Sequence, residues 1–283
     1  LRKDAYDSAD FIDAFHSFQD DEMTKKVSSK KSNSKYPNST VLLIEDNKEL
    51  LNWMVRFLSN KYNCLYAENA EEGLRIAREK SIDIIISDVM MPGMDGFELC
   101  GILKNDLNTS HIPIILITAK TFEKDVQEGY ALGANSYVKK PFNPETLTYE
   151  IDNYISLKKT FVERFNSNYK DTALIQKLSV HDRKLIEKAN EYIETNISNT
   201  NLNVELMASG LAMSRSSLFR KIKSLTETTP NEYIKNYRLT SAMELLKEEK
   251  YSLIEISEKI GFGGYYYFRK CFIEKFNVRP ELV

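Results

Sequence analysis

Residues 82–87 read IDIIIS, a run of apolar residues without the alternation of a half-exposed strand. Two further runs, VLLIE at 41–45 and IPIILIT at 112–118, have the same character. Shorter strand-like stretches lie at 62–69 and 135–140. Strands that are apolar throughout and alternate with helices are typical of a parallel sheet covered on both faces. The sequence therefore predicts an α/β fold, a doubly wound five-stranded parallel sheet, with helices expected at 47–59, 70–80, 97–106, 122–133 and 144–156.

Composition divides the chain into four parts. Residues 1–40 end in the Ser/Lys/Asn-rich stretch KKVSSKKSNSKYPNST, which is typical of a linker, and a short helix is expected only at 11–18. The α/β domain is expected at 41–157, and residues 158–182 are expected to form a second linker. Every segment within 183–283 has helical periodicity, which predicts a separate all-α domain.

Membrane and secreted classes find little support. No apolar run approaches the roughly 20 residues of a membrane helix, and no signal peptide is visible. The cysteines, Cys64, Cys100 and Cys271, have neither metal nor disulfide spacing, which fits a reducing cytoplasm. We therefore expect a cytoplasmic chain without membrane contact. Because the sequence starts at Leu1, an upstream segment that anchors a full-length protein in the inner membrane stays open.

Charge differs between the two expected domains. Residues 41–157 contain 11 Lys and Arg against 18 Asp and Glu, a net charge of −7. Residues 183–283 contain 16 against 13, a net charge of +3. An acidic part followed by a mildly basic part favours two tasks, the second of them nucleic-acid binding. Ordinary solvated surfaces show such imbalances too, so motifs must decide.

Polar side chains stand at the ends of the predicted strands. Glu45 and Asp46 follow the first strand, Asp88 follows the third, and Thr118 and Lys140 end the fourth and fifth. Because the carboxyl ends of parallel strands are neighbours, the three carboxylates should converge in one acidic pocket. Their repulsion favours a cation, and an oxygen-only cluster suits Mg²⁺. A carboxylate nucleophile beside a hydroxyl and an ammonium can accept a phosphoryl group.

The motifs VLLIEDN, IIISDVMMPGMDGFEL, IPIILITAK and SYVKKPF resemble, in order and spacing, the receiver domains of two-component response regulators, over about 40–157. The resemblance implies that Asp88 is the phosphoacceptor. It also implies that Glu45, Asp46, Asp88 and the backbone carbonyl of Met90 hold Mg²⁺. The resemblance further implies that Thr118 is the switch hydroxyl, Lys140 the family lysine and Tyr137 the switch aromatic. For Tyr137, plain core packing is the alternative.

The helical part contains two short-helix, turn and helix patterns. In the first, MSRSSLFRKIK (213–223), Ser214 is expected to cap a helix with basic residues, as in a recognition helix that enters the major groove. In the second, ISEKIGFGGYYYFRKCF (256–272), a glycine turn precedes another basic helix. A helix of about 18 residues, roughly 27 Å long, joins the two units and would let them reach adjacent groove segments. The expected DNA contacts are Arg215, Ser216, Ser217, Arg220, Lys221, Lys223, Tyr265, Tyr266, Arg269 and Lys270.

Residues 185–283 resemble the AraC/XylS-type helix-turn-helix DNA-binding domain, through MSRSSLFRKIK, TPNEYIKNYRLTSAMELL and GF…YYFRKCFIEKFNVRP. The chain departs from that family in three places. At the first turn, Ala212 replaces the usual glycine and Gly210 lies inside the preceding helix. In the second unit, Gly263-Gly264-Tyr265 replaces a more polar turn and cap, and Asn277 replaces a glycine at a turn where asparagine tolerates positive φ. The family pattern implies that Tyr267 and Phe268 are core residues.

These features together predict a phosphorylation-dependent transcription regulator of a two-component system, not an enzyme with an outside product. The expected partners are a histidine kinase, double-stranded operator DNA and a second copy of the chain, which the family suggests upon phosphorylation. Residues 1–40 resemble the segment after a sensor kinase in hybrid regulators, where the kinase belongs to the same polypeptide. A stand-alone response regulator with a separate kinase, and a phosphotransfer or protein-interaction module without DNA binding, are the alternatives.

Overall fold

The computed structural model describes residues 35–119, 129 and 131–283. They form two compact units that divide between Leu157 and Lys158. The short helix expected at 11–18 lies outside the described residues, as does most of the helix expected at 122–133. Among the described helices, none is both long enough and apolar enough to span a bilayer.

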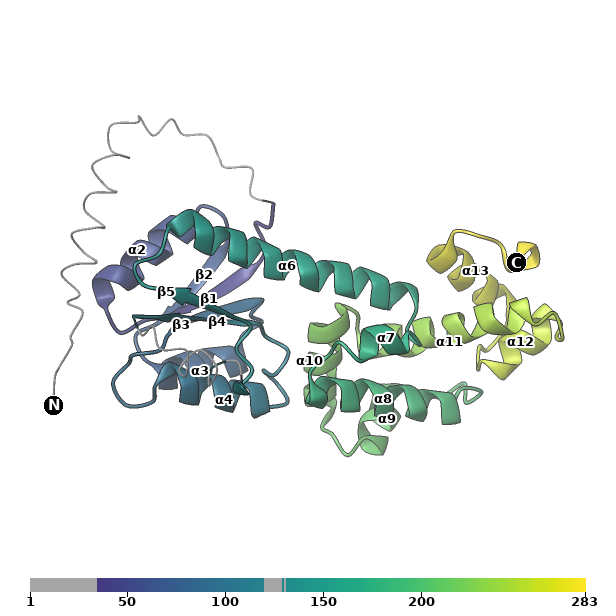
Figure 1. Cartoon of the computed structure of the whole chain (residues 1–283). Helices are drawn as coiled ribbons and strands as arrows, with labels where there is room; N and C mark the ends of the chain where they lie inside the picture. The colour runs from purple at the N-terminus through teal and green to yellow at the C-terminus, as the bar shows by residue number, and fades with distance from the viewer. Residues whose placement is uncertain (1–34, 120–128, 130) are drawn as a thin grey trace. The chain divides into compact units, whose positions relative to one another are not determined.

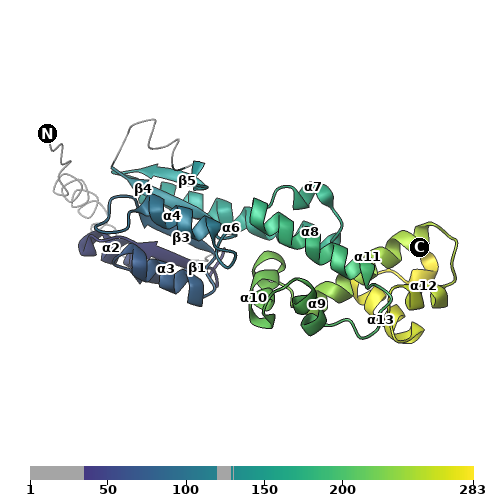
Figure 2. The same ribbon diagram turned by 90° about the horizontal axis from the view of Figure 1, so that it is seen from below.

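The first unit contains a five-stranded sheet in which every neighbouring pair is parallel. The strand order is β2-β1-β3-β4-β5, which confirms the doubly wound fold predicted from the apolar runs (Figures 1 and 2). The strands are β1 (Thr40–Ile44), β2 (Asn63–Ala67), β3 (Ile84–Asp88), β4 (Ile114–Thr118) and β5 (Ser136–Lys139).

Helices cover both faces of this sheet, as Figure 1 shows. One face carries α3 (Ala70–Glu79) and α4 (Gly96–Asn105), which pack on side chains such as Leu42 and Ile85. The other face carries α2 (Lys48–Leu58) and the first turns of α6 (Pro144–Ser167), which pack on side chains such as Leu43 and Ile86. Successive strand residues point to opposite faces, so strands buried on both sides must be apolar throughout.

The second unit is helical. Its elements after the end of α6 are α7 (Thr172–Ile175), α8 (Val180–Thr195), α9 (Val204–Gly210), α10 (Arg215–Thr226), α11 (Pro230–Lys247), α12 (Leu253–Lys259), α13 (Tyr265–Phe276) and the 3₁₀ turn η1 (Pro280–Leu282).

The second unit has two hydrophobic cores, and α11 contributes to both. Its N-terminal half, with Tyr233 and Tyr237, packs with α8, α9 and α10. Its C-terminal half, with Leu239 and Leu246, packs with α12 and α13. Each core therefore supports one helix-turn-helix unit, α9–α10 or α12–α13.

The structure shows the local geometry of three departures noted in the sequence, at Gly210, Ala212 and Asn277. Gly210 lets α9 approach α8, since a Cβ there would lie 2.1 Å from the Tyr192 ring. Ala212 adopts φ 54 and Asn277 φ 54. Asparagine tolerates this left-handed region, as expected, whereas alanine is strained in it.

The segment 158–182, expected as a linker, is largely helical and partly buried. The helix α6 continues to Ser167 instead of ending near 156, and α7 follows. Phe165 and Tyr169 are buried in the core around α8, α10 and α11. Phe161 and Phe165 lie four residues apart on one face of α6, and Tyr169 continues this spacing just beyond the end of the helix at Ser167. The many polar residues between them concealed this stripe.

Candidate functional site

An acidic cluster lies at the carboxyl ends of β1 and β3. Glu45, Asp46 and Asp88 each place an oxygen within 4.8 Å of the others. Neighbouring parallel strands bring them together, because Val41 pairs with Ile84 and both strands end at this edge. Glu45 and Asp88 are buried, whereas Asp46 is exposed. Three carboxylates this close form an oxygen donor set of the kind that suits Mg²⁺.

Lys140, which follows β5, reaches into the cluster. Its Nζ lies 2.8 Å from Glu45 Oε2 and 2.9 Å from Asp88 Oδ2. Burial, and then the charge of Asp88, raise the pKa of Glu45 to about 7, although Lys140 acts in the opposite direction. Burial alone would lower the pKa of Lys140, but the two carboxylates raise it. One ammonium therefore offsets only part of the negative charge, and a cation would stabilise the cluster.

The backbone around Asp88 is held in place by its neighbours. The Met90 N–H donates to Asp88 Oδ1 at 3.3 Å. Gly96 begins α4 against this backbone, and a Cβ there would lie 2.2 Å from the Asp88 carbonyl oxygen. Asp95 caps α4 with a reciprocal capping box through Glu98. The loop after β3 is thus tied to the start of α4 at the acidic edge.

Thr118 and Tyr137 lie on the two strands beyond β3. Thr118 is the last residue of β4 and is 1% exposed. Tyr137, in β5, stacks on Phe97 with ring centroids 6.0 Å apart. In this structure Tyr137 packs against the core formed with α3 and α4. Apart from Tyr137, which is the second residue of β5, the candidate residues of the first unit therefore stand at the carboxyl ends of strands or within two residues of them.

The outward face of α10 carries several of the residues predicted to contact DNA. Arg215 is exposed and pairs with Glu205 at 3.0 Å. Ser214 is the N-cap of α10, because its Oγ accepts a hydrogen bond from the Ser217 N–H. Phe219 is 43% exposed on this face. It was not predicted to contact DNA, because a phenylalanine in a helix usually packs in the core. An apolar side chain there can contact a thymine methyl group. The other exposed residues of this face are Ser216, Arg220 and Lys223.

Lys221 was wrongly predicted to contact DNA. Its side chain is 0% exposed, and its Nζ lies 2.6 Å from Oδ1 of Asp182, which is itself 2% exposed. Lys221 lies three residues after Leu218 and four before Leu225, so it shares their buried face. Lys221 is thus a charged residue at a buried position, and Asp182 of α8 compensates its charge.

The tyrosine triplet of α13 divides differently from the prediction. Tyr266 is 87% exposed, as expected, but Tyr267 is 59% exposed and was wrongly assigned to the core. Tyr265 instead packs against the second core, together with the buried Phe268. Spacings of three and four residues put 265, 268 and 272 on the inner face.

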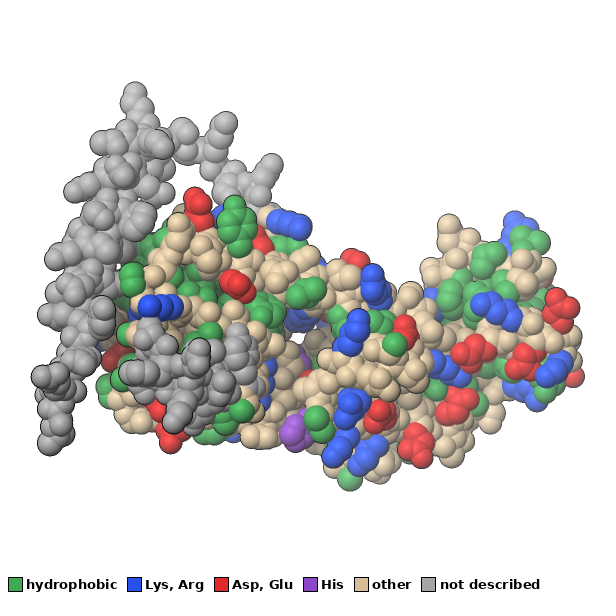
Figure 3. Space-filling model, in the orientation of Figure 1, with side chains coloured by type: hydrophobic (Ala, Val, Ile, Leu, Met, Phe, Trp, Pro, Cys, Tyr) green, Lys and Arg blue, Asp and Glu red, His purple; other side chains and the backbone are tan. Residues whose placement is uncertain are grey.

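Arg269 and Lys270 differ in their surroundings. The Arg269 Nε donates to Glu281 at 2.7 Å, and Tyr265 donates to the same carboxylate. The side chain of Lys270 is 73% exposed. On the face in Figure 3, blue Lys and Arg side chains of the second unit are interspersed with red Asp and Glu. The visible surface therefore has no single charged patch among the described residues, and the prediction of DNA binding rests on the individual helices α10 and α13.

Comparison with known proteins identifies both units. Residues 41–152 match the response regulator receiver domain, and residues 207–282 match a helix-turn-helix domain. The chain therefore combines a response-regulator receiver domain with a helix-turn-helix domain of the AraC type.

The chain is similar to several known proteins, three of which follow. The chain is 38% identical over 243 residues to Histidine kinase P4 of Formosa agariphila, covering 86% of this chain and 18% of that protein. It is 35% identical over 133 residues to transcriptional regulatory protein YvrH of Bacillus subtilis, covering 46% and 54%. It thus spans about half or less of these two relatives. Among solved structures, the chemotaxis protein CheY4 of Vibrio cholerae is 33% identical, with a TM-score of 0.40 over 41% of this chain and 98% of that one.

Proposed function

We propose that this chain is a phosphorylation-dependent transcription regulator, in which phosphorylation of the receiver controls sequence-specific DNA binding by the second unit. The observation that carries the proposal is the cluster of Glu45, Asp46 and Asp88 with Lys140 Nζ 2.9 Å from Asp88. The regulator names of relatives such as YvrH support the same reading. The chain acts on itself and on DNA, not on an outside substrate.

In the proposed reaction, a carboxylate oxygen of Asp88 attacks the phosphorus of a phosphohistidine. The P–N bond breaks, the imidazole leaves with the bonding electron pair, and an aspartyl phosphate remains. Lys140, already 2.9 Å from Asp88, stabilises the charge of the transferred group. Glu45, Asp46, Asp88 and the backbone carbonyl of Met90 would hold Mg²⁺. When bound, this ion would neutralise negative charge on the phosphoryl oxygens.

The phosphoryl donor is proposed to be a histidine kinase. The name of the relative Histidine kinase P4 supports a kinase in the same polypeptide. A separate kinase would deliver the same group to the same aspartate. Thr118 would then bind the new phosphoryl group and Tyr137 would respond, shifting the population between two arrangements of the receiver.

The proposed DNA contacts lie on the exposed faces of α10 and α13. Arg220, Lys223 and Lys270 supply phosphate contacts, while Ser216 and Tyr266 stand near the helix starts, where base edges are read. Residues 1–40 and 158–182 were both predicted as linkers; only the first proposal is kept, since 158–182 contributes to the core around α8, α10 and α11. Phosphorylation is proposed to favour a homodimer, which would place two such domains on an operator.

Phosphorylation is tested by incubating the purified chain with an acyl phosphate and Mg²⁺, then measuring intact mass. We expect one phosphoryl adduct in the wild type and none in Asp88→Asn. Asp83→Asn is the matched control, because Asp83 lies just before the other end of the same strand. An adduct that persists in Asp88→Asn would assign the phosphoryl group to another residue.

DNA binding is tested by selecting duplexes from a random library and measuring affinity at several salt concentrations. Phosphate contacts release counterions, so affinity should fall steeply with salt. Phosphorylated and Asp88→Asn protein should differ in affinity for the selected duplex. If no duplex is enriched and affinity is independent of salt, the helical unit is a protein-interaction module instead.

A further inference from the structure

Residues 165–170, here named the bridging segment, lie outside both matched ranges, 41–152 and 207–282. They nevertheless form part of the second unit. Phe165 is 1% exposed and Tyr169 0% exposed. The Tyr169 ring meets the Tyr233 ring of α11 edge-on, with centroids 4.9 Å apart. The segment is therefore anchored in the core that also supports α10.

The bridging segment touches the ends of both candidate recognition helices. Asn166 Nδ2 donates to the carbonyl oxygen of Thr226, the last residue of α10, at 3.0 Å. Lys275 of α13 donates to the carbonyl oxygen of Asn166 at 2.8 Å. The same ammonium lies 4.9 Å from the centroid of the Tyr169 ring. One asparagine thus connects α10 and α13, which otherwise belong to different hydrophobic cores.

Further polar contacts hold the Asn166 side chain in this orientation. Tyr169 donates its hydroxyl hydrogen to Asn166 Oδ1 at 2.7 Å, which fixes the amide so that Nδ2 faces Thr226. Asn236 of α11 donates to the Tyr169 hydroxyl at 3.2 Å. The Asn166 amide therefore has partners for both its oxygen and its nitrogen, and rotation would break both bonds.

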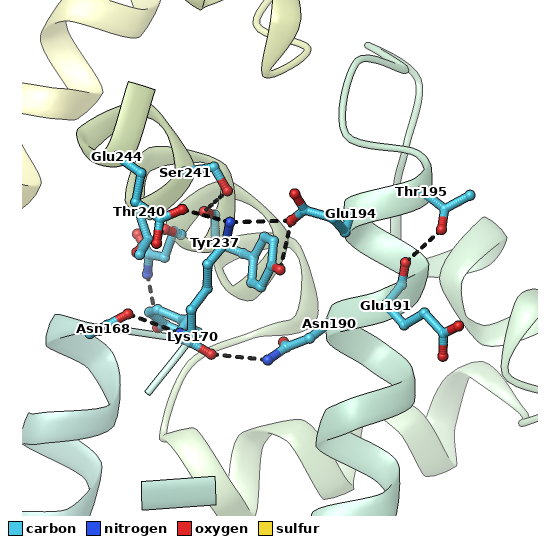
Figure 4. Close-up of polar contacts among 12 residues, drawn as sticks. Asn168, Lys170, Asn190, Glu191, Glu194, Thr195, Tyr237, Thr240, Ser241 and Glu244 are labelled. Atoms are coloured by element: carbon cyan, nitrogen blue, oxygen red, sulfur yellow. Dashed lines mark hydrogen bonds and ion pairs between the residues drawn. The ribbon is translucent and has the colours of Figure 1, made fainter. Parts of the chain in front are cut away.

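Lys170 fastens the other end of the segment, as Figure 4 shows. Its Nζ lies 2.8 Å from Glu244 of α11 and 3.3 Å from Glu194 of α8. Glu194 also accepts from the Tyr237 hydroxyl at 2.7 Å. Asn190 of α8 donates to the Tyr169 carbonyl oxygen at 2.9 Å. The segment is thus held by four helices: α8, α10, α11 and α13.

We propose that the bridging segment sets the orientation of α10 relative to α13, and thereby the spacing between the two DNA half-sites that the domain accepts. Asn166 and Lys275 are the positioning residues. The proposal rests on the DNA binding put forward under the proposed function. Two helices that enter successive major grooves must match a repeat of about 34 Å. A change in their mutual orientation therefore changes which spacing fits both.

A second link between the two cores lies elsewhere in the unit. Arg238 of α11 donates to the carbonyl oxygens of Gly261 and Asn199, which precede α13 and α9. This link joins the loop before α9 to the turn between α12 and α13, whereas the bridging segment joins the ends of α10 and α13. Loss of the bridging segment should therefore alter orientation without separating the cores.

The test compares Asn166→Ala with Asn168→Ala in the full chain. Asn168 is an exposed neighbour whose side chain accepts from the Lys170 N–H within the segment itself, so it is a matched control. Three kinds of duplex are used: the selected duplex, versions with one or two base pairs inserted between its halves, and versions with either half replaced. Lys275→Met is the second variant, and circular dichroism reports whether each variant is folded.

We expect Asn166→Ala to bind the intact duplex roughly tenfold more weakly. It should also change the ranking of the inserted duplexes and bind each half-replaced duplex as the wild type does. Lys275→Met should change the ranking in the same way, and Asn168→Ala should not. An unchanged ranking in both variants, or an equal loss on intact and half-replaced duplexes, overturns the proposal. Failure of the wild type to select any duplex would instead overturn DNA binding itself, and the proposal with it.

Discussion

Replacing Lys221 with methionine tests whether this face of α10 is buried against α8, as it is in the structure. The sequence pattern assigns Lys221 to DNA, whereas the structure buries it 2.6 Å from Asp182. Methionine keeps an apolar stem in the core and removes only the ammonium group. The Asp182 carboxylate would then remain buried without its cation. Water solvates the Asp182 carboxylate in the unfolded state but not in the folded state, so the substitution should lower the free energy of unfolding.

The expected loss follows from the burial of both partners. With side chains 0% and 2% exposed, solvent screens the pair little. Removing one partner of such a pair costs about 3–5 kcal/mol. That corresponds to roughly two to four powers of ten in the unfolding equilibrium constant. Asp182→Leu combined with Lys221→Met should recover most of the loss, because an apolar pair leaves no charge buried.

Urea unfolding followed by circular dichroism measures this loss in the helical unit. The only tryptophan, Trp53, lies in α2 of the first unit, so its fluorescence transition should stay unchanged. Lys223→Met, on the exposed side of the same helix, should cost less than about 1 kcal/mol. If Lys221→Met were as stable as the wild type but bound DNA more weakly, Lys221 would be a surface contact and the buried pair would be refuted.

Three further predictions follow from single residues. Folding raises the pKa of Glu45 from 4.5 to about 7, so the folded state binds this proton more tightly than the unfolded state. Without divalent cations, the free energy of unfolding of the first unit should therefore fall as pH rises from 4.5 through 7. Glu45→Gln should flatten this decline in urea titrations at pH 5 to 8, and an equally steep decline would contradict it. Ala212→Gly should stabilise the second unit by about 1 kcal/mol in thermal unfolding, since Ala212 holds φ 54; a destabilised variant would show the turn to be unstrained. Tyr266→Ala should weaken binding to the selected duplex and leave the melting temperature unchanged, because this side chain is 87% exposed; a lower melting temperature would mean that it packs in the core.

The acidic site was predictable from the sequence because topology alone assembles it. Apolar runs identified the strands, and parallel strands end at one edge, so residues after each run had to meet. Glu45 and Asp88 required no long-range information beyond that rule. The contacts of Lys140 did require long-range information, because Lys140 follows the edge strand β5. Its side chain must reach across β4 and β3 to Glu45. The strand order and the length of the lysine side chain together make this possible.

The helical unit was harder to predict, because its polar residues make contacts at long sequence distance. Lys221 faces inward because a carboxylate 39 residues earlier compensates it, and no local pattern signals that pairing. Similarly, Asn166 bonds to Thr226 and Lys275, which are far along the chain. Periodicity could have revealed the apolar stripe of Phe161, Phe165 and Tyr169, but not the helices that it packs against.

The buried pair also determines which side of α10 is available to DNA. Asp182 lies in the first turn of α8, where its N–H donates to Ser179 Oγ and the helix dipole favours a negative charge. This position makes a buried carboxylate less costly there than elsewhere. Because Lys221 must point toward Asp182, rotation of α10 about its axis is fixed. A rotation that exposed Lys221 would bury charged residues of the opposite face without partners. The residues left outward then include Arg215, Ser216, Phe219, Arg220 and Lys223. The lysine that was mistaken for a DNA contact therefore orients the residues proposed to make such contacts.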